Sequence, residues 1–449
     1  MSTTERPPTE RSERNAPGRN GVEIARPLGG VGGFYRSYEV YQRQRVQQST
    51  YLVHPRFFSR PEFLRDPYPT LKLIRENYPF LRDWVSNCDW VTAYNDVTSI
   101  FVDDANFETR TKLWFYGMAG WGRDLGQELP VLSTWTQRID ACIEPVAREL
   151  ATDIRERRHG DLVDDFTNNL DLRILCDVLD LPAERHEQFA AGYRAMHEGW
   201  QWHPRREEAG RAALADLAAM FAPLLEERRQ RPGDDLISAV AALDLADGPA
   251  QAEDLVATLL EADGDSLRAS LANMWCLLLT HPDQLADVRG DAALIKRAWQ
   301  ESIRHSAPIV QARRFARHEV ERFGRLIPEG GMLICSAAAA NRDATVFSEP
   351  DRFDVHRTDL CFREARGQYR ADGLPSGISF GTGKPSKFPA IPEDRPRSWY
   401  AVTRDAAVTA SRVLIELLPG LRLADGAAPA LLCRWPGDSH TCWDLAVEV

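Results

Sequence analysis

The chain has 449 residues, 43% hydrophobic and 27% charged, which excludes collagen-like, low-complexity and wholly disordered proteins. Its 66 acidic residues outnumber its 55 basic ones, and the net charge of −11 argues against nucleic acid as the main partner, because phosphate binding needs a basic surface. The eight cysteines contain no CxxC pair, so free thiols in a reducing cytoplasm are expected. No run of about 18 apolar residues is present, and no membrane span is expected.

Residues 1–33 are rich in Pro, Arg, Ser and Glu and lack the apolar core of a signal peptide. They are expected to form a disordered tail. Residues 34–449 show no linker-like interruption and no internal repeat, so a single domain is expected there.

The expected elements follow apolar periodicity and the signals that begin and end helices. Residues 70–80 are helix-like, and 89–101 read as a strand followed by a helix that opens at Asn95. Further helices are expected at 137–160, 163–180, 183–199, 205–230, 291–305 and 400–418. Short strands are expected over 312–336, with a turn at 328–331, and after the last helix.

The longest apolar segment, 251–280, is apolar around much of its circumference. Such a helix is expected to run buried through the domain centre and to kink near Gly264, because glycine costs about 1 kcal/mol within a helix. Helices dominate and strands are short, so the predicted class is mainly α with minor β.

The sharpest motifs lie in the C-terminal half. Glu301 and Arg304 are spaced as neighbours on one helix face, a pattern that is weak by itself. Residues 325–357 contain a strand, a turn, a short helix, and the sequences NRD and PDRF. Residues 380–383, FGTG, form a glycine turn ahead of the final helix.

Together with the central helix ending in THPDQL (280–285), this order of motifs resembles the cytochrome P-450 family of the soluble bacterial type. The resemblance covers about residues 60–449 and implies the cytochrome P-450-like fold. It also implies that Glu301 and Arg304 have a structural role, holding the core together through a buried ion-pair network with the NRD and PDRF segment.

The haem loop departs from the family pattern FGxGxHxCxG. Pro385 stands where the family has its histidine, and Lys387 stands where it has the cysteine that ligates iron. A protonated lysine cannot ligate iron, and a neutral one lacks the electron donation of a thiolate. The nearest cysteines, Cys361 and Cys433, lie outside the loop.

A second departure concerns the helix that carries a propionate-binding His-x-x-x-Arg in the family. Ungapped placement sets this helix over 122–133, where Asp124 and Glu128 take the two anchoring positions. Acidic residues there would repel propionates. Arg314 still matches a propionate-binding arginine, so three of four haem anchors are missing and a pocket without haem is expected, with no metal. Without haem, Phe388, Pro389, Trp399 or the aromatic segment 114–121 is expected to fill the space.

Asp265 and Ser266 occupy the family's acid–alcohol pair, which relays protons to iron-bound oxygen; without haem they are equally explained as residues of a helix kink. They are provisional catalytic residues. The ten histidines include no pair at metal-ligand spacing, so no zinc site is expected. Two aromatic groups, 114–121 and 200–203, are explained as core or as pocket lining.

Three functions remain open. The first is a haem-free auxiliary protein that acts with a protein partner in a bacterial natural-product pathway. The second is an enzyme that uses the old pocket for non-oxidative chemistry, with Asp265, Ser266 or Asp124 as acid or base. The third is a haem monooxygenase in which Cys361 or another residue reaches iron. A small hydrophobic molecule is a candidate ligand of the pocket.

Overall fold

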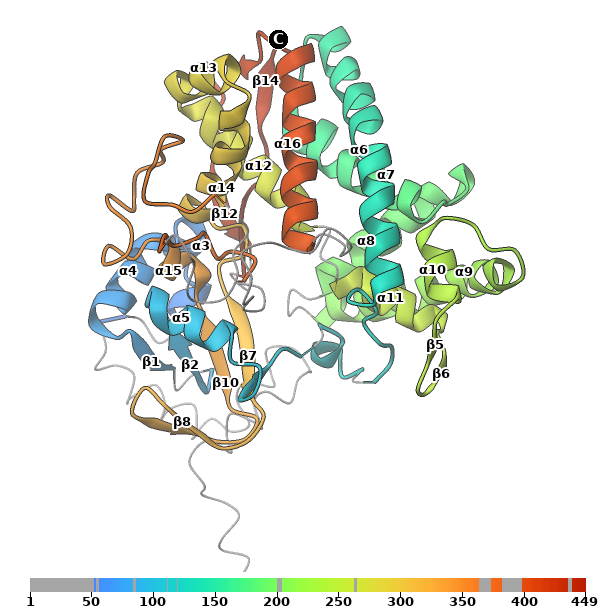
Figure 1. The fold of residues 1–449 in the computed structure, drawn as a ribbon. Helices are drawn as coiled ribbons and strands as arrows, with labels where there is room; N and C mark the ends of the chain where they lie inside the picture. Colours follow the sequence, from blue (N-terminus) through green and yellow to red (C-terminus); the bar gives the residue numbers. More distant parts are fainter. Residues whose placement is uncertain are drawn as a thin grey trace, which may run out of the picture.

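The computed structural model describes residues 52–53, 56–83, 86–110, 112–118, 120–199, 204–261, 265–362, 373–381, 398–434 and 438–449. The expected tail, 1–33, and its boundary lie outside these residues. Within the described part, helices dominate and strands are short, so the predicted class is confirmed. Figure 1 shows a sheet region with α4, α5 and α15 on one side of the molecule and the longer helices on the other.

The α-helices are α3 (Pro61–Arg65), α4 (Tyr68–Asn77), α5 (Tyr94–Phe101), α6 (Leu129–Arg157), α7 (Asn168–Val178), α8 (His186–Glu198), α9 (Pro204–Gln230), α10 (Leu236–Ala241), α11 (Ala252–Glu261), α12 (Asp265–Thr280), α13 (Pro282–Gly290), α14 (Ala293–His305), α15 (Ala337–Asn341) and α16 (Trp399–Leu417). A π-helical segment, Leu162–Thr167, leads into α7, and short 3-10 helices lie at Phe57–Ser59, Lys112–Tyr116 and Ala183–Arg185.

The strands are β1 (Phe80–Asp83), β2 (Cys88–Val91), β3 (Phe107–Glu108), β4 (His159–Asp161), β5 (Asp244–Leu245), β6 (Gly248–Pro249), β7 (Ala312–Ala316), β8 (Val320–Arg322), β9 (Arg325–Ile327), β10 (Met332–Cys335), β11 (Arg422–Leu423), β12 (Leu431–Arg434), β13 (Ser439–Cys442) and β14 (Ala446–Glu448). The main sheet has the order β1-β2-β10-β7-β3 and is antiparallel except between β2 and β10. A second sheet joins β11, β14 and β4, and β12 pairs with β13 as a hairpin.

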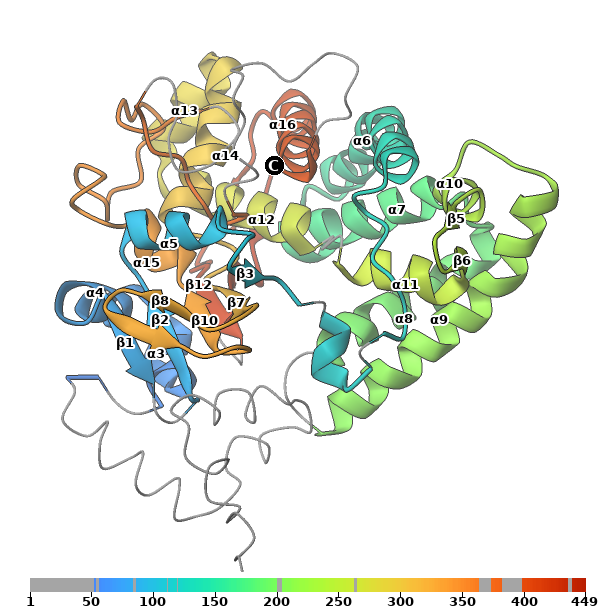
Figure 2. The same cartoon turned by 60° about the horizontal axis from the view of Figure 1, so that its bottom comes forward.

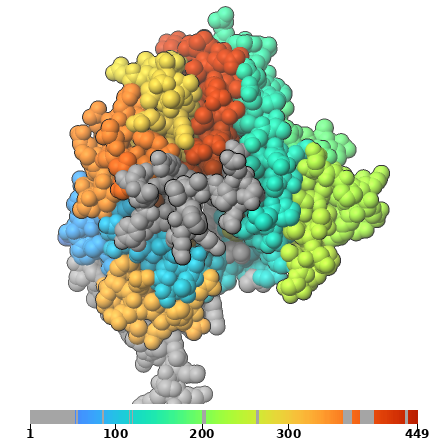
Figure 3. Space-filling model, in the orientation of Figure 1, coloured from blue at the N-terminus to red at the C-terminus, as the bar shows by residue number. Residues whose placement is uncertain are grey.

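The helix α6 differs from the expected 137–160. It begins at Leu129, with Pro130 in its first turn, where a missing N–H costs nothing. It ends at Arg157 because Arg158 takes a left-handed conformation, with φ of 62°, and the next residues pair with β14 instead. The final helix α16 packs along α6 on the face shown in Figure 3.

The central helix runs where the sequence predicts. Helices α11 and α12 span 252–280 apart from 262–264, which lie outside the described residues together with the expected kink at Gly264. Every residue of α12 from Leu267 to Leu279 is buried, and Figure 2 shows α12 between the sheet region and α7.

Three polar side chains on α12 are nevertheless buried, and each has a partner, as buried polar groups require. Arg268 lies over the ring of Trp443, 4.9 Å from its centroid, and the Ser270 hydroxyl accepts from Trp299 Nε1 at 3.1 Å. The Asn273 amide donates to the carbonyls of Ser306 and His440, at 2.9 and 2.8 Å, and accepts from the Cys442 N–H at 3.0 Å. The central helix is thereby tied to the C-terminal hairpin.

Candidate ligand cavity

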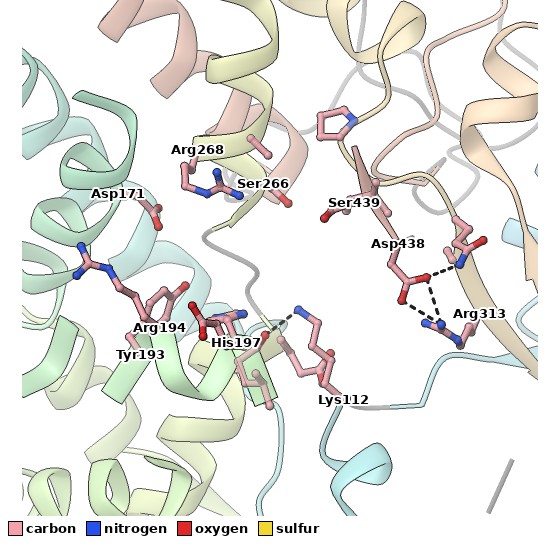
Figure 4. Close-up of a pocket in the computed structure, with 18 of the residues that line it drawn as sticks. Lys112, Asp171, Tyr193, Arg194, His197, Ser266, Arg268, Arg313, Asp438 and Ser439 are labelled. Carbon is pink, nitrogen blue, oxygen red and sulfur yellow. Dashed lines mark hydrogen bonds and ion pairs between the residues drawn. The ribbon is translucent and has the colours of Figure 1, made fainter. Parts of the chain in front are cut away.

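A cavity of about 450 Å³ lies where the edge of the main sheet faces the helices. Its walls come from α7, α8, the start of α12, the segment 308–315 and the β12–β13 hairpin. Figure 4 shows side chains from these elements arranged around it. The labelled side chains are polar or charged, and apolar side chains such as Val163, Leu172 and Phe315 complete a lining that is mostly apolar, as in other small-molecule pockets.

One wall is a polar cluster that joins β7 to the hairpin. Asp438 accepts two hydrogen bonds from Arg313 Nη2, at 3.0 and 3.2 Å, and a further one from Gln311 Nε2. The backbone is held as well, since the Val310 N–H donates to the Asp438 carbonyl at 2.8 Å and the His440 N–H to the Pro308 carbonyl at 2.9 Å. This wall is therefore a fixed part of the fold.

The opposite wall is built by α7, α8 and α12. Asp171 and Arg268 are both buried, and the rings of Tyr193 and His197 lie 4.5 Å apart, centroid to centroid. Lys112 lies at the lower side in Figure 4, where its ammonium donates to the carbonyl of Leu260 at 3.1 Å. The cavity thus has charged groups on both sides.

Of the provisional catalytic pair, Ser266 lines the cavity. Asp265 begins α12, but its side chain lies outside the described part of the structure, as do Pro385 and Lys387. The aromatic group at 200–203 also lies outside it. The catalytic role of Asp265 and Ser266 stays a prediction.

Arg314 also lines the cavity. Its guanidinium lies 4.8 Å from the ring centroid of Phe101 and donates to the carbonyl of Arg313 at 3.0 Å. No carboxylate of the described residues forms an ion pair with it, and burial lowers its pKa. A cation in this setting suits an anionic group, so Arg314 remains compatible with the propionate-binding role that the resemblance implies.

Glu301 and Arg304 lie away from the cavity, both with fully buried side chains. Arg304 Nε and Nη2 donate to the two carboxylate oxygens of Glu301, each at 2.7 Å. Its remaining donors reach the carbonyls of Asn341, Pro350 and Arg352, at 3.1, 2.7 and 3.0 Å. All five N–H groups of the guanidinium are therefore used.

The carboxylate of Glu301 has two further partners just after the PDRF segment. It accepts from the Asp354 N–H at 3.1 Å and from Arg357 Nε at 3.3 Å. The ion pair thus connects α14 to the segment 341–357, the arrangement that the resemblance implies. Its contribution to stability is a prediction, taken up in the Discussion.

The prediction of a helix over 122–133 is wrong for the first half of that range. Residues 122–128 are not helical, and α6 begins only at Leu129. Residues 123–126 make other bonds instead of helical ones. Arg123 pairs with Asp254 at 2.6 Å, and the Leu125 N–H donates to the Thr258 hydroxyl at 2.8 Å. Asp124 accepts a hydrogen bond from the Gly126 N–H at 2.9 Å. Asp124 and Glu128 are exposed, and neither lines the cavity.

Trp399, one of the residues expected to fill the haem space, packs against this same segment. Its indole lies edge-on to Trp135, with centroids 4.6 Å apart, and donates to the carbonyl of Gly126 at 3.3 Å. Phe388 and Pro389 lie outside the described residues. Within 114–121, Tyr116 belongs to the main core and donates to the Met196 carbonyl at 2.9 Å.

The close approach of this segment to α11 requires glycine at position 122. A Cβ there would lie 2.8 Å from the carbonyl carbon of Glu253, nearer than Cβ contacts normally come. We expect Gly122→Ala to lower the free energy of unfolding by about 1–3 kcal/mol, because the backbone of residue 122 or of Glu253 must move to admit the methyl group. Gly290→Ala is the matched control, since nothing lies within 4 Å of a Cβ there. Equal urea midpoints for the two variants would contradict this packing.

The cysteines decide whether the chain fits haem bound through a thiolate. All eight are described, none forms a disulfide, and none lines the cavity. Cys361, the candidate for an alternative ligand, lies beside Phe362, whose ring packs on Arg297 of α14, and its N–H donates to the Pro375 carbonyl at 2.7 Å. No cysteine therefore lines this cavity, and the expected ligand loop at 382–397 lies outside the described residues.

Within the described ranges, no group of three or more His, Cys, Asp or Glu comes together that would hold a metal ion. In the same part of the chain, no helix is both long enough and apolar enough to cross a bilayer.

Several cavity residues were not singled out from the sequence: Gln311, Arg313, Asp438, Arg268, Tyr193 and His197. Arg268 could have been identified from the sequence, because a charged residue inside an otherwise apolar, buried helix needs a functional or structural explanation. Asp438 could not, because an aspartate before a short strand is an ordinary turn residue.

The order of elements, with the central helix, the buried ion pair and the short sheets, is the fold of cytochromes P-450. It matches the structure of P450BioI in complex with an acyl carrier protein ligated to hexadec-9Z-enoic acid, with TM-score 0.70 and 21% identity, over 86% of this chain and 99% of that one. It also matches the cytochrome P450 PksS of the Bacillus subtilis bacillaene polyketide synthase, with TM-score 0.68 and 20% identity, over 88% and 99% of the two chains.

Sequence relatives agree with the fold. The chain is 34% identical to 6-deoxyerythronolide B hydroxylase of Saccharopolyspora erythraea over 247 residues, which is 54% of this chain and 58% of that relative. It is 26% identical to pulcherriminic acid synthase of Bacillus subtilis over 341 residues, 72% and 83% of the two chains. The match to the first relative thus spans less than two thirds of its length. No family model matches the chain. The chain is thus similar in sequence to bacterial cytochromes P-450 and shares their fold.

Proposed function

We propose that this chain is a cytochrome P-450-like protein of bacterial secondary metabolism that does not hold haem through a cysteine thiolate and serves as an auxiliary to a protein partner of its pathway. The observation that carries the proposal is the position of the cysteines, all described, with none lining the cavity. The Glu301–Arg304 network, in contrast, is complete. A chain that retains the structural core of the fold but lacks the cysteine ligand favours a function that depends on the folded scaffold rather than on haem chemistry. The relative crystallised with an acyl carrier protein supports a protein partner as a class.

A monooxygenase with an altered ligand loop is the second candidate. The names of the relatives favour it directly, since they include a hydroxylase and an epoxidase. Ser266, on the proton-relay segment of the resemblance, lines the cavity, and Arg314 is available for an anionic group. A haem-free pocket enzyme is less well supported, because Asp124 does not share the cavity with Ser266.

The absorbance spectrum separates the two candidates. We expect the protein, expressed with a haem precursor and purified, to be colourless and to form no reduced carbon monoxide complex. A Soret band with a carbon monoxide complex would establish the monooxygenase instead. If the protein is colourless, co-purification of a tagged chain with the product of a neighbouring gene tests the auxiliary role.

Restoring a cysteine at position 387 tests whether the loss of this one ligand is enough to explain the absence of haem. We expect Lys387→Cys to remain colourless, because Pro385 still stands where the family has the histidine that helps to hold a propionate. A red Lys387→Cys protein would show that the haem site is otherwise intact, and the argument from several losses would be wrong.

A further inference from the structure

Charged side chains around the cavity are mostly paired with one another or with neighbouring groups. Arg313 pairs with Asp438 at 3.0 Å, and Arg110 pairs with Glu108 at 3.1 Å. Arg314 differs from these two arginines, because no carboxylate of the described residues forms an ion pair with it. It therefore brings a positive charge to the cavity wall that the protein itself does not neutralise.

The donors of the Arg314 guanidinium are only partly used. Nη1 donates to the Arg313 carbonyl at 3.0 Å, and the guanidinium carbon lies 4.8 Å from the ring centroid of Phe101. Nε and Nη2 donate to no group of the described residues, and neither is among the buried polar atoms that lack a partner. These two donors are therefore accessible. Asp104 attracts the guanidinium only from an exposed position, where water screens its charge.

The rest of the lining is mostly apolar and includes the side chains of Val163, Leu172, Leu260 and Phe315. Such a surface favours a hydrocarbon, because apolar groups gain free energy when they leave water together. A hydrocarbon alone would displace water from Arg314 and leave its donors unpaired, which is unfavourable. A molecule with one anionic end avoids this cost, because a guanidinium and a carboxylate form two parallel hydrogen bonds.

We propose that the cavity binds an apolar monocarboxylate, whose carboxylate accepts hydrogen bonds from Nε and Nη2 of Arg314 and whose hydrocarbon part lies along the apolar lining. This inference rests on the proposed function, since the family resemblance assigns Arg314 to a propionate when haem is bound. It refines the small hydrophobic molecule considered from the sequence by giving that molecule one charged end.

Calorimetric titration of the full chain with decanoate and with decylammonium tests the proposal, because the two probes carry similar hydrocarbon chains and opposite charges. We expect decanoate to bind at least about tenfold more tightly than decylammonium, the effect of hydrogen bonds between charged groups. The net charge of −11 attracts the cationic probe at long range. A preference for the anion therefore has to come from a local cation.

Arg314→Gln identifies that cation. We expect this variant to bind decanoate about ten- to a hundredfold more weakly than wild type and to bind decylammonium no more weakly. Arg317→Gln is the matched control, because it changes the net charge equally. Arg317 is exposed, pairs with Glu108 at 3.1 Å and does not line the cavity, so the affinity of this variant for decanoate should stay within twofold of wild type.

The proposal is overturned if decanoate does not bind at millimolar concentration, if decylammonium binds as tightly, or if the two glutamine variants behave alike. Circular dichroism shows whether Arg314→Gln folds. The comparison of the two probes uses wild-type protein alone and decides the matter if it does not. A Soret band would overturn the proposed function together with this inference, whereas a colourless protein that does not bind decanoate overturns this inference alone.

Discussion

Replacing Glu301 with alanine is expected to lower the free energy of unfolding by about 3–5 kcal/mol. The variant leaves Arg304 buried without its carboxylate and also removes one of the partners of Arg357 and the acceptor of the Asp354 N–H. An uncompensated buried charge is what makes the loss large, rather than the net value of the ion pair. Urea denaturation followed by circular dichroism measures the change.

Two further variants make this test specific. Glu301→Gln keeps the shape and some hydrogen bonds, and it should fall between wild type and Glu301→Ala. Glu149→Ala removes an exposed partner of Arg173, a bidentate pair at 2.7 Å, and should cost no more than about 1 kcal/mol. A Glu301→Ala protein with the wild-type midpoint would show that this network does not hold the segment 341–357 in place.

Stability should fall as the solution becomes acidic below about pH 6.5, with His440 as one cause. Burial, with a smaller contribution from the nearby Arg342, lowers the pKa of His440 to about 3. Burial and the charges of Arg342 and Arg304 also lower the pKa of His305. Between pH 6.5 and pH 3 the unfolded chain therefore binds a proton that folded His440 does not. The free energy of unfolding consequently decreases as the pH falls through this window.

His440→Phe isolates this contribution. The imidazole lies edge-on to Tyr68, with centroids 5.4 Å apart, so a phenyl ring preserves much of the packing and removes the titration. Wild type should lose about 2 kcal/mol more than His440→Phe between pH 7 and pH 5. Identical slopes for wild type and His440→Phe would mean that His440 is protonated in the folded protein.

Much of the helical framework is predictable from the sequence because it depends on local pattern. The central helix shows this, since Leu267 to Leu279 are apolar on nearly every side and are all buried. The strand at 88–91 and the helix from Tyr94 follow the same kind of signal. The segment 122–128 is not predictable by ungapped placement, because its bonds to Asp254 and Thr258 compete with helix formation and Gly126 weakens the helix.

The cavity is harder to predict for a different reason. Gln311 and Asp438 are separated by 127 positions, so neither residue carries a local signal for the other. Ser266 and Arg314 were found only through the family resemblance. The acidic and basic groups of α7 and α8 look, in the sequence, like the solvated faces of ordinary helices.

The attachment of the central helix to the C-terminal hairpin has a consequence for folding. Asn273 bonds to residues 167 and 169 positions further along the chain, and closing loops of that length slows folding more than it affects stability. The wall that carries Gln311 and Asp438 depends on this hairpin, so we expect it to form after the local helices. A molecule that occupies the cavity would therefore slow unfolding far more than it would accelerate refolding, because it binds only once this last contact is made.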